Sequence, residues 1–132
     1  KIRENKTKLH LAMVELYQDT VFARGNFEDC QTCGCARAGQ LRESRHHGYC
    51  FWHEQDEETI EATGHVYLSF GIFDEMRDAF EVGVLIVRTL WCQGLAVQWN
   101  GDVATRIQVV LGMDKILLEG RKVAAYREMG IA

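Results

Sequence analysis

Apolar and polar residues follow one another in patterns that predict both helices and strands. Between residues 4 and 23 apolar side chains recur at helical spacing and the positions between them are polar or charged, which predicts an amphipathic helix. Its apolar stripe consists of Leu9, Met13, Leu16, Tyr17 and Val21. Residues 26–47 carry several cysteines, and Gly34 and Gly39 favour a loop there, with one short helix over 36–44.

The second half of the chain predicts strands around a longer helix. Residues 49–53 and 66–70 each follow a glycine and predict strands, with a short helix over 56–62 between them. Asp74 is the expected N-cap of a helix that ends at Gly94. Residues 95–99 predict a further strand, and Asn100-Gly101 predicts a tight hairpin turn into a strand over 105–111.

Together these elements predict one α/β domain over residues 1–132, with α+β as the related alternative. The sheet is expected to be small and mixed, with about four strands, a βαβ unit over 66–99 and a C-terminal hairpin. The sheet and its crossover helix occupy 48–111, and a last helix is expected over 114–129. The chain contains no proline and no evident linker, so a second domain is not expected.

Composition narrows the class of protein. With 132 residues, 47% hydrophobic and 26% charged, the chain is long and apolar enough to form a core without a metal or disulfide. The net charge of -4 and the lack of a Lys/Arg run argue against nucleic acid and anionic membranes as partners. The most apolar stretch, 79–95, contains charged residues and is too short to span a bilayer.

Cysteine content indicates the compartment. The chain has 5 cysteines, an odd number, which fits a reducing compartment better than a secreted disulfide scaffold. The first residues alternate charged and apolar side chains and lack the apolar core of a signal peptide. We therefore expect a cytoplasmic protein.

A series of short motifs carries a family resemblance. In order they are NFEDCQTCG, GYCFWHEQD, VYLSFG and GLAVQWNGD followed by TRIQV. Over residues 26–111 the chain resembles an uncharacterised bacterial family described as a domain of unknown function. The resemblance implies a bacterial, cytoplasmic α/β domain and implies no reaction. Cys35 and Cys50 depart from the family pattern, which has a small residue or His at the first position and an aliphatic residue at the second.

The cysteines and histidines predict a zinc site. Cys30-x-x-Cys33 and Cys50-x-x-His53 have the spacing of a four-ligand site, with substitutes at Cys35, His46 and His47. A strand over 49–53 would direct Cys50 and His53 to opposite faces. Cys30, Cys33 and one nearby histidine are therefore the better set of ligands.

The same two cysteines also fit redox chemistry. A C-x-x-C dithiol at the start of a helix has a lowered thiol pKa and exchanges disulfides readily. The alternative is that Cys30 and Cys33 are ordinary buried thiols without a reaction. The motif does not follow a strand directly, so a thioredoxin-like fold is not indicated.

Acid and base side chains gather after the strand over 49–53. His53, Glu54 and Asp56 are residue types that a hydrolase or isomerase uses, and they would form one site with Gly71 and Asn100 if their strands were parallel. The structural alternative is a helix N-terminus capped by Asp56.

Other polar and aromatic residues are interpreted as structural. Asn100, Gly101, Asp102 and Arg106 are expected to form a turn and a strand charge, and the core is expected to contain Trp52, Trp91 and Trp99.

Three functions follow from these patterns. The first is a binding or interaction module, stabilised by zinc at the C-x-x-C loop. The second is a small enzyme that uses His53 with Glu54 or Asp56, and the third is a thiol redox protein that uses Cys30 and Cys33. The sequence selects no substrate, partner or oligomeric state.

Overall fold

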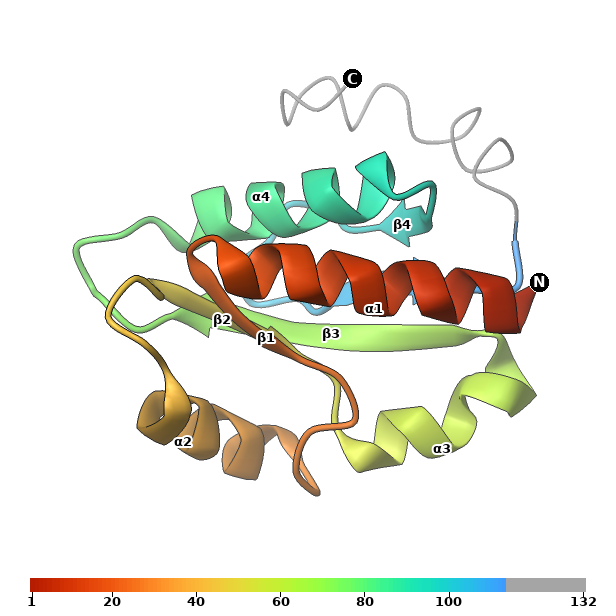
Figure 1. Cartoon of the computed structure of the whole chain (residues 1–132), viewed down its shortest axis with the longest axis horizontal. Coiled ribbons are helices and arrows are strands. Elements are labelled where there is room, and N and C mark those ends of the chain that lie inside the picture. Colours follow the sequence, from red (N-terminus) through yellow and green to blue (C-terminus); the bar gives the residue numbers. More distant parts are fainter. Residues whose placement is uncertain (114–132) are drawn as a thin grey trace.

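The protein is a mixed sheet with helices on both faces. The computed structural model describes residues 1–113, and the helix predicted over 114–129 lies outside them. Helices α1 (Ile2–Gln18) and α4 (Ala79–Cys92) cover one face, and α2 (Gln31–Leu41) and α3 (Glu54–Thr63) cover the other (Figure 1). This arrangement confirms the predicted α/β class, and residues 1–113 form one domain.

The sheet has five strands in the order β1-β2-β3-β5-β4. Their bounds are β1 (Val21–Arg24), β2 (Gly48–Phe51), β3 (His65–Ile72), β4 (Ala96–Gln98) and β5 (Ile107–Val110). β1 and β2 are parallel, and every other neighbouring pair is antiparallel. The long strand β3 pairs with β5 through its first half and with β2 through its second half. The two halves of the sheet therefore meet at the middle of β3.

The predicted strand, crossover helix, strand and hairpin are present. β3 and β4 run in the same direction, α4 connects them, and β5 lies between them. The hairpin turn is longer than predicted, because residues 99–106 separate the two strands. The indole of Trp99 donates to the carbonyl oxygens of Asp102 and Thr105 at 3.0 and 3.1 Å, which holds this longer loop in place.

The main core lies between the sheet and helices α1 and α4. Val66 and Leu68 of β3 are buried in it with Leu9 of α1 and Leu90 of α4. Burial of each such side chain contributes about 1.5–3 kcal/mol. Because side chains alternate along a strand, Tyr67 and Ser69 face the side of α2 and α3.

The first strand was not predicted. The chain leaves α1 after Gln18, and Val21, which fits the helical stripe, begins β1 instead. Val21 and Phe22 are fully buried in this edge strand. An apolar residue near the end of a helical pattern fits either element, and pairing with β2 decides between them.

Helix α2 begins earlier and is longer than the predicted segment over 36–44. It contains Gly34 and Gly39, which were expected to prevent a long helix. A Cβ at Gly34 would lie 2.3 Å from the ring of Phe51, so the close packing of α2 on β2 requires glycine there. Tertiary packing thus outweighs the low helix propensity of glycine.

Helix α4, in contrast, begins later than predicted. Asp78, and not Asp74, is its N-cap, and the Asp78 carboxylate accepts the N–H of Phe80.

None of the helices within residues 1–113 has the length and apolar character that a membrane span requires.

Candidate functional site

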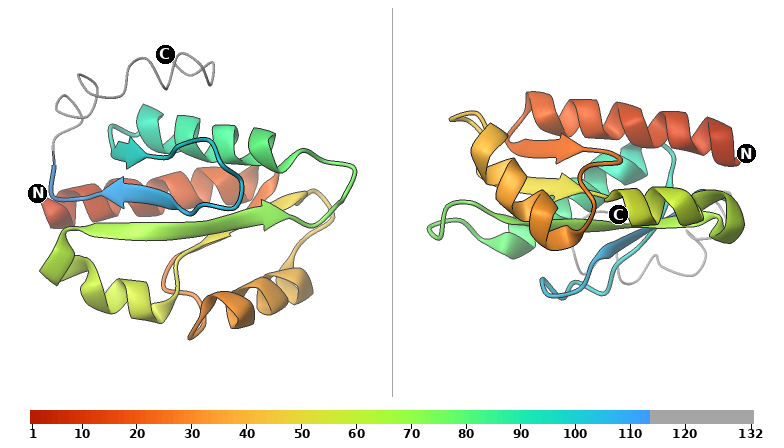
Figure 2. Two further views of the ribbon diagram at one scale, coloured as in Figure 1. Left: turned by 180° about the vertical axis from the view of Figure 1, so that it is seen from behind. Right: turned by 90° about the horizontal axis from the view of Figure 1, so that it is seen from below.

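The N-termini of α2 and α3 start from the same edge of the sheet. β1 and β2 are parallel neighbours, and each leads from its carboxyl end into one of these helices. Two backbone hydrogen bonds join the connecting loops: Phe27 N–H to Trp52 O at 2.8 Å and Glu54 N–H to Glu28 O at 3.0 Å. Both helices lie on the same face of the sheet (Figure 2). The start of α2 is thus held beside the start of α3.

The C-x-x-C motif forms the first turn of α2. Cys30 is the N-cap, and its sulfur accepts the backbone N–H of Cys33 at 3.4 Å. The two Sγ atoms lie 3.1 Å apart, within hydrogen-bond distance. Cys33 is exposed and Cys30 is partly exposed. Both sulfurs are therefore within reach of a dissolved reactant.

Hydrogen bonding makes the two thiols unequal. The backbone N–H of Cys33, followed by its side chain, lowers the pKa of the Cys30 thiol below its ordinary value. The same side-chain hydrogen bond raises the pKa of Cys33. The carboxyl groups of Asp29 and Glu28 raise it further. Cys30 is consequently the sulfur that deprotonates first.

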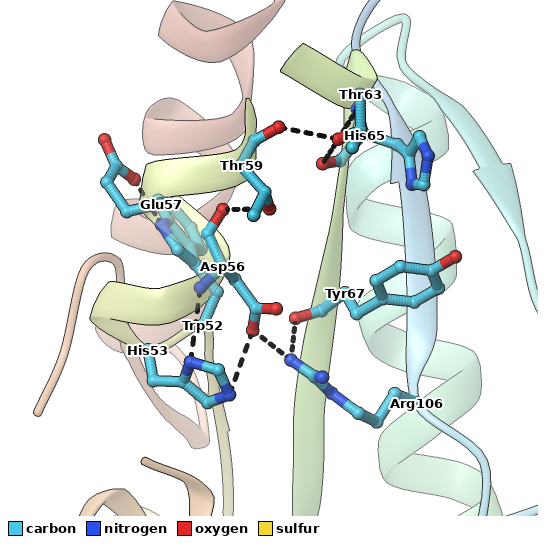
Figure 3. A network of polar contacts seen from close by, with 9 residues as sticks. All are labelled: Trp52, His53, Asp56, Glu57, Thr59, Thr63, His65, Tyr67 and Arg106. Carbon is cyan, nitrogen blue, oxygen red and sulfur yellow. Dashed lines mark hydrogen bonds and ion pairs between the residues drawn. The ribbon is translucent and has the colours of Figure 1, made fainter. Parts of the chain in front are cut away.

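His53 caps α3. Its Nδ1 accepts the backbone N–H of Asp56 at 3.3 Å, and its Nε2 lies 3.3 Å from the Asp56 carboxylate. The side chain of His53 is 11% exposed. Both ring nitrogens are occupied in the first turn of α3 (Figure 3). The N-cap is therefore His53, in place of the predicted Asp56.

Arg106 joins the start of β5 to the start of α3. Its Nη2 donates to the Asp56 carboxylate and to the carbonyl oxygen of Tyr67 (Figure 3). The ion pair is partly shielded, since the Asp56 side chain is 13% exposed and that of Arg106 is 29% exposed. Arg106 thereby lies over the centre of β3, on the face that carries α3.

A small polar cavity opens between α2 and the centre of the sheet. Its volume is about 150 Å³, and it is lined by Gln31, Ser69, Phe70, Val103, Ala104, Thr105 and Arg106. Gln31 is the residue between Cys30 and Thr32 of the C-x-x-C motif. Within residues 1–113, the buried Ser69 Oγ and Arg106 Nε have no hydrogen-bond partner. The cavity thus combines unsatisfied polar atoms with a wall from the cysteine motif.

The predicted zinc ligands are dispersed. Among residues 1–113 no group of three or more His, Cys, Asp or Glu side chains is placed to hold a metal ion. His46 is buried between the backbone N–H of Glu43 and the carbonyl oxygen of Tyr17, and His47 contacts Arg77. Cys50 is fully buried in the core, where burial raises its thiol pKa. The structure therefore brings together only Cys30 and Cys33.

The predicted shared edge of His53, Gly71 and Asn100 is wrong. β2 is antiparallel to β3, so the carboxyl ends of these two strands point to opposite edges of the sheet. His53 instead lies with Asp56 and Arg106. Glu54 remains at the surface, where a hydrogen bond to Asp29 raises its pKa.

Comparison with known families places the whole site in one family. The model of a domain of unknown function (DUF6891) matches residues 3–114. The chain belongs to this family. The match confirms the resemblance to a domain of unknown function, and it also takes in α1. Every residue of the site described above lies within the DUF6891 domain. Comparisons with curated proteins and with solved structures give no significant match.

The sequence did not identify Ser69 or Arg106 as members of the site. A serine within the apolar run VYLSFG was an available signal, because a buried hydroxyl needs a partner. Arg106 offered no such signal, since a charge before a strand is ordinary. Arg106 and Asp56 both belong to the DUF6891 domain but are far apart in the chain. They come into contact because of the order of the strands in the sheet.

Proposed function

We propose that the protein carries out thiol–disulfide exchange at Cys30 and Cys33. The observation that carries the proposal is the Cys30 sulfur at the N-cap of α2, 3.1 Å from the sulfur of Cys33. A helix N-terminus favours a thiolate because its N–H groups and dipole stabilise negative charge. The helix of 11 residues is long enough to supply this effect.

The reaction uses a disulfide substrate as the oxidant. The Cys30 thiolate attacks one sulfur of the substrate, the substrate S–S bond breaks, and one thiolate leaves and takes up a proton. Cys33 then loses its proton and attacks the Cys30 sulfur of the mixed disulfide, which releases the second substrate thiol. Two electrons pass from the protein dithiol to the substrate, and the protein gains an intramolecular disulfide. A thiol reductant such as glutathione regenerates the dithiol, which fits a cytoplasmic location.

The geometry supports this function better than the other two predicted from the sequence. Acid–base catalysis by His53 would require a free ring nitrogen, and both nitrogens are occupied in the α3 cap. A zinc-stabilised binding module would require a third ligand near Cys30 and Cys33, and residues 1–113 supply none. Thiol exchange requires only the two sulfurs and their helix.

The proposal is tested by trapping the mixed disulfide. Reduced protein is mixed with oxidised glutathione, quenched with acid and analysed by mass spectrometry. We expect wild type to form the Cys30–Cys33 disulfide, Cys33→Ser to accumulate one glutathione on Cys30, and Cys30→Ser to react about tenfold more slowly. Cys92→Ser is the matched control, because Cys92 is an exposed thiol on α4, outside the motif. Reaction of Cys92 as fast as that of Cys30 would contradict the proposal.

A further inference from the structure

The cavity beside the C-x-x-C motif contains polar atoms that the fold does not use. Ser69 is 1% exposed, and its hydroxyl has no hydrogen-bond partner among the described residues. Arg106 uses Nη2 to donate to the Asp56 carboxylate and the Tyr67 carbonyl. Its buried Nε has no hydrogen-bond partner among residues 1–113. An unsatisfied buried polar group costs about 1–3 kcal/mol, and native structures hold few of them.

Both atoms offer a hydrogen to a ligand. Arg106 Nε–H is a donor only, and the Ser69 hydroxyl can donate as well. The residues Ser69 and Arg106 both line the cavity, so an oxygen bound between them is the group that would satisfy both donors. The positive charge of Arg106 is already paired with the Asp56 carboxylate. The negative charges of Glu28 and Asp29 raise the pKa of the Cys33 thiol. This balance of charge favours the neutral oxygen of a peptide carbonyl over a carboxylate.

The cavity and the C-x-x-C motif have one residue in common. Gln31 lines the cavity, and it directly follows Cys30 in the chain. On the other side of the motif, Gly34 directly follows Cys33 and packs against Phe51, which is the cross-strand partner of Ser69. Cross-strand partners have Cα atoms about 4.5–5.5 Å apart. A group bound in the cavity would therefore lie beside the first turn of α2.

The size of the cavity also fits a substrate group. Its volume of about 150 Å³ is far above what one water molecule needs, roughly 10–15 Å³. The backbone carbonyl of a cysteine lies a few bonds from its sulfur, so a cystine within a peptide can present both groups to neighbouring positions. A simple dialkyl disulfide such as diethyl disulfide has no oxygen that could accept these hydrogen bonds.

We infer that Ser69 and Arg106 bind a backbone carbonyl of the substrate, so that the protein acts on disulfides of peptides or proteins in preference to small disulfides without a carbonyl. This inference rests on the proposed thiol–disulfide exchange. It assigns Ser69 and Arg106 as residues that determine specificity, while the cysteines carry the chemistry.

The test compares two neutral disulfides. One is cystine with acetylated amino groups and methylamide carboxyl ends, and the other is diethyl disulfide, which has no oxygen. We expect Ser69→Ala and Arg106→Lys each to lower the rate ratio between the first and the second by about fivefold, the order of one hydrogen bond. Tyr67→Phe is the matched control, because it removes a hydroxyl from the same face of β3, outside the cavity lining. The control should leave the ratio unchanged.

The outcomes separate the inference from the function on which it rests. If wild type reacts with both disulfides and the variants leave the ratio unchanged, the cavity holds only water and the inference is overturned. If the variants slow both reactions equally, the two residues only support the position of the cysteines, which also overturns it. If wild type reacts with neither disulfide, thiol exchange itself is overturned. Thermal unfolding of each variant confirms that the protein is folded in the assay.

Discussion

The ring of Phe51 lies directly against Gly34, so that α2 and β2 approach more closely at this point than any residue with a Cβ allows. Phe51 is fully buried, with Phe27 packed edge-on against it and Tyr49 stacked on it, so neighbouring rings oppose any displacement. Because Gly34 follows Cys33, this contact also fixes the turn that carries the two sulfurs. The packing of one glycine thus links the core to the candidate site.

Replacement of this glycine should therefore destabilise the protein. We expect Gly34→Ala to lower the free energy of unfolding by about 1–3 kcal/mol, the usual cost of overpacking a core. Gly39→Ala is the matched control in the same helix, because a Cβ at Gly39 would meet nothing within 4 Å. That substitution should raise stability by about 0.5–1 kcal/mol through helix propensity. Urea denaturation measures both, and equal effects would refute the packing argument.

The pH dependence of alkylation should distinguish the two cysteines of the motif. Thiolates are alkylated and thiols are not, so the rate at each site rises with pH through the pKa of that sulfur. Since hydrogen bonds from Cys33 lower the pKa of Cys30, its rate should reach half of its maximum below the value of about 8.5 for a free cysteine. Cys33 should reach half of its maximum at higher pH.

Variants test the cause of that difference. Cys33→Ala removes the side-chain hydrogen bond but keeps the backbone N–H, so the midpoint for Cys30 should rise only part of the way to that of a free cysteine. Cys30→Ala should lower the midpoint for Cys33, because the interaction that raises it is lost. Iodoacetamide labelling resolved by site in mass spectrometry provides the measurement. A Cys30 midpoint that Cys33→Ala leaves unchanged would show that the side chain of Cys33 has no part in the effect.

His53 should act through its helix cap. His53→Ala removes the side-chain acceptor for the Asp56 N–H and is expected to cost about 0.5–2 kcal/mol, as for other N-caps. His53→Asn supplies a new capping oxygen and should recover most of that loss. Chemical denaturation measures stability, and glutathione exchange measures activity. Loss of exchange in a stable His53→Asn variant would instead support an acid–base role for the imidazole.

Cys50 should be unreactive in the folded protein. It is fully buried and burial raises its pKa, so neither access nor ionisation favours reaction. We expect maleimide to label Cys33 and Cys92, which are exposed, while Cys50 becomes labelled only after unfolding in denaturant. Rapid labelling of Cys50 without denaturant would contradict this expectation and mean that β2 opens locally.

The sequence predicted the elements whose signals are local. The strand around Val66, the helix that ends near Gly94 and the following strand were recognised because each repeats one periodicity over its own length. Cys30 and Cys33 were also identified from a local signal, since four consecutive residues define the motif. The early start of α2 was missed because the benefit of glycine at position 34 lies in its contact with Phe51 of another element.

The tertiary structure alone decided which residues share a site. Arg106 is far from His53 and Asp56 in the chain, and the order β1-β2-β3-β5-β4 brings Arg106 to the helix cap that these two residues form. The predicted grouping of His53 with Gly71 and Asn100 depended on β2 running parallel to β3, whereas these two strands pair in antiparallel directions. Strand order and direction arise from contacts between distant segments, and the period of a strand is the same for either direction. The residues of one strand therefore reveal the strand itself, whereas its neighbours and the site that they build are set only when the sheet assembles.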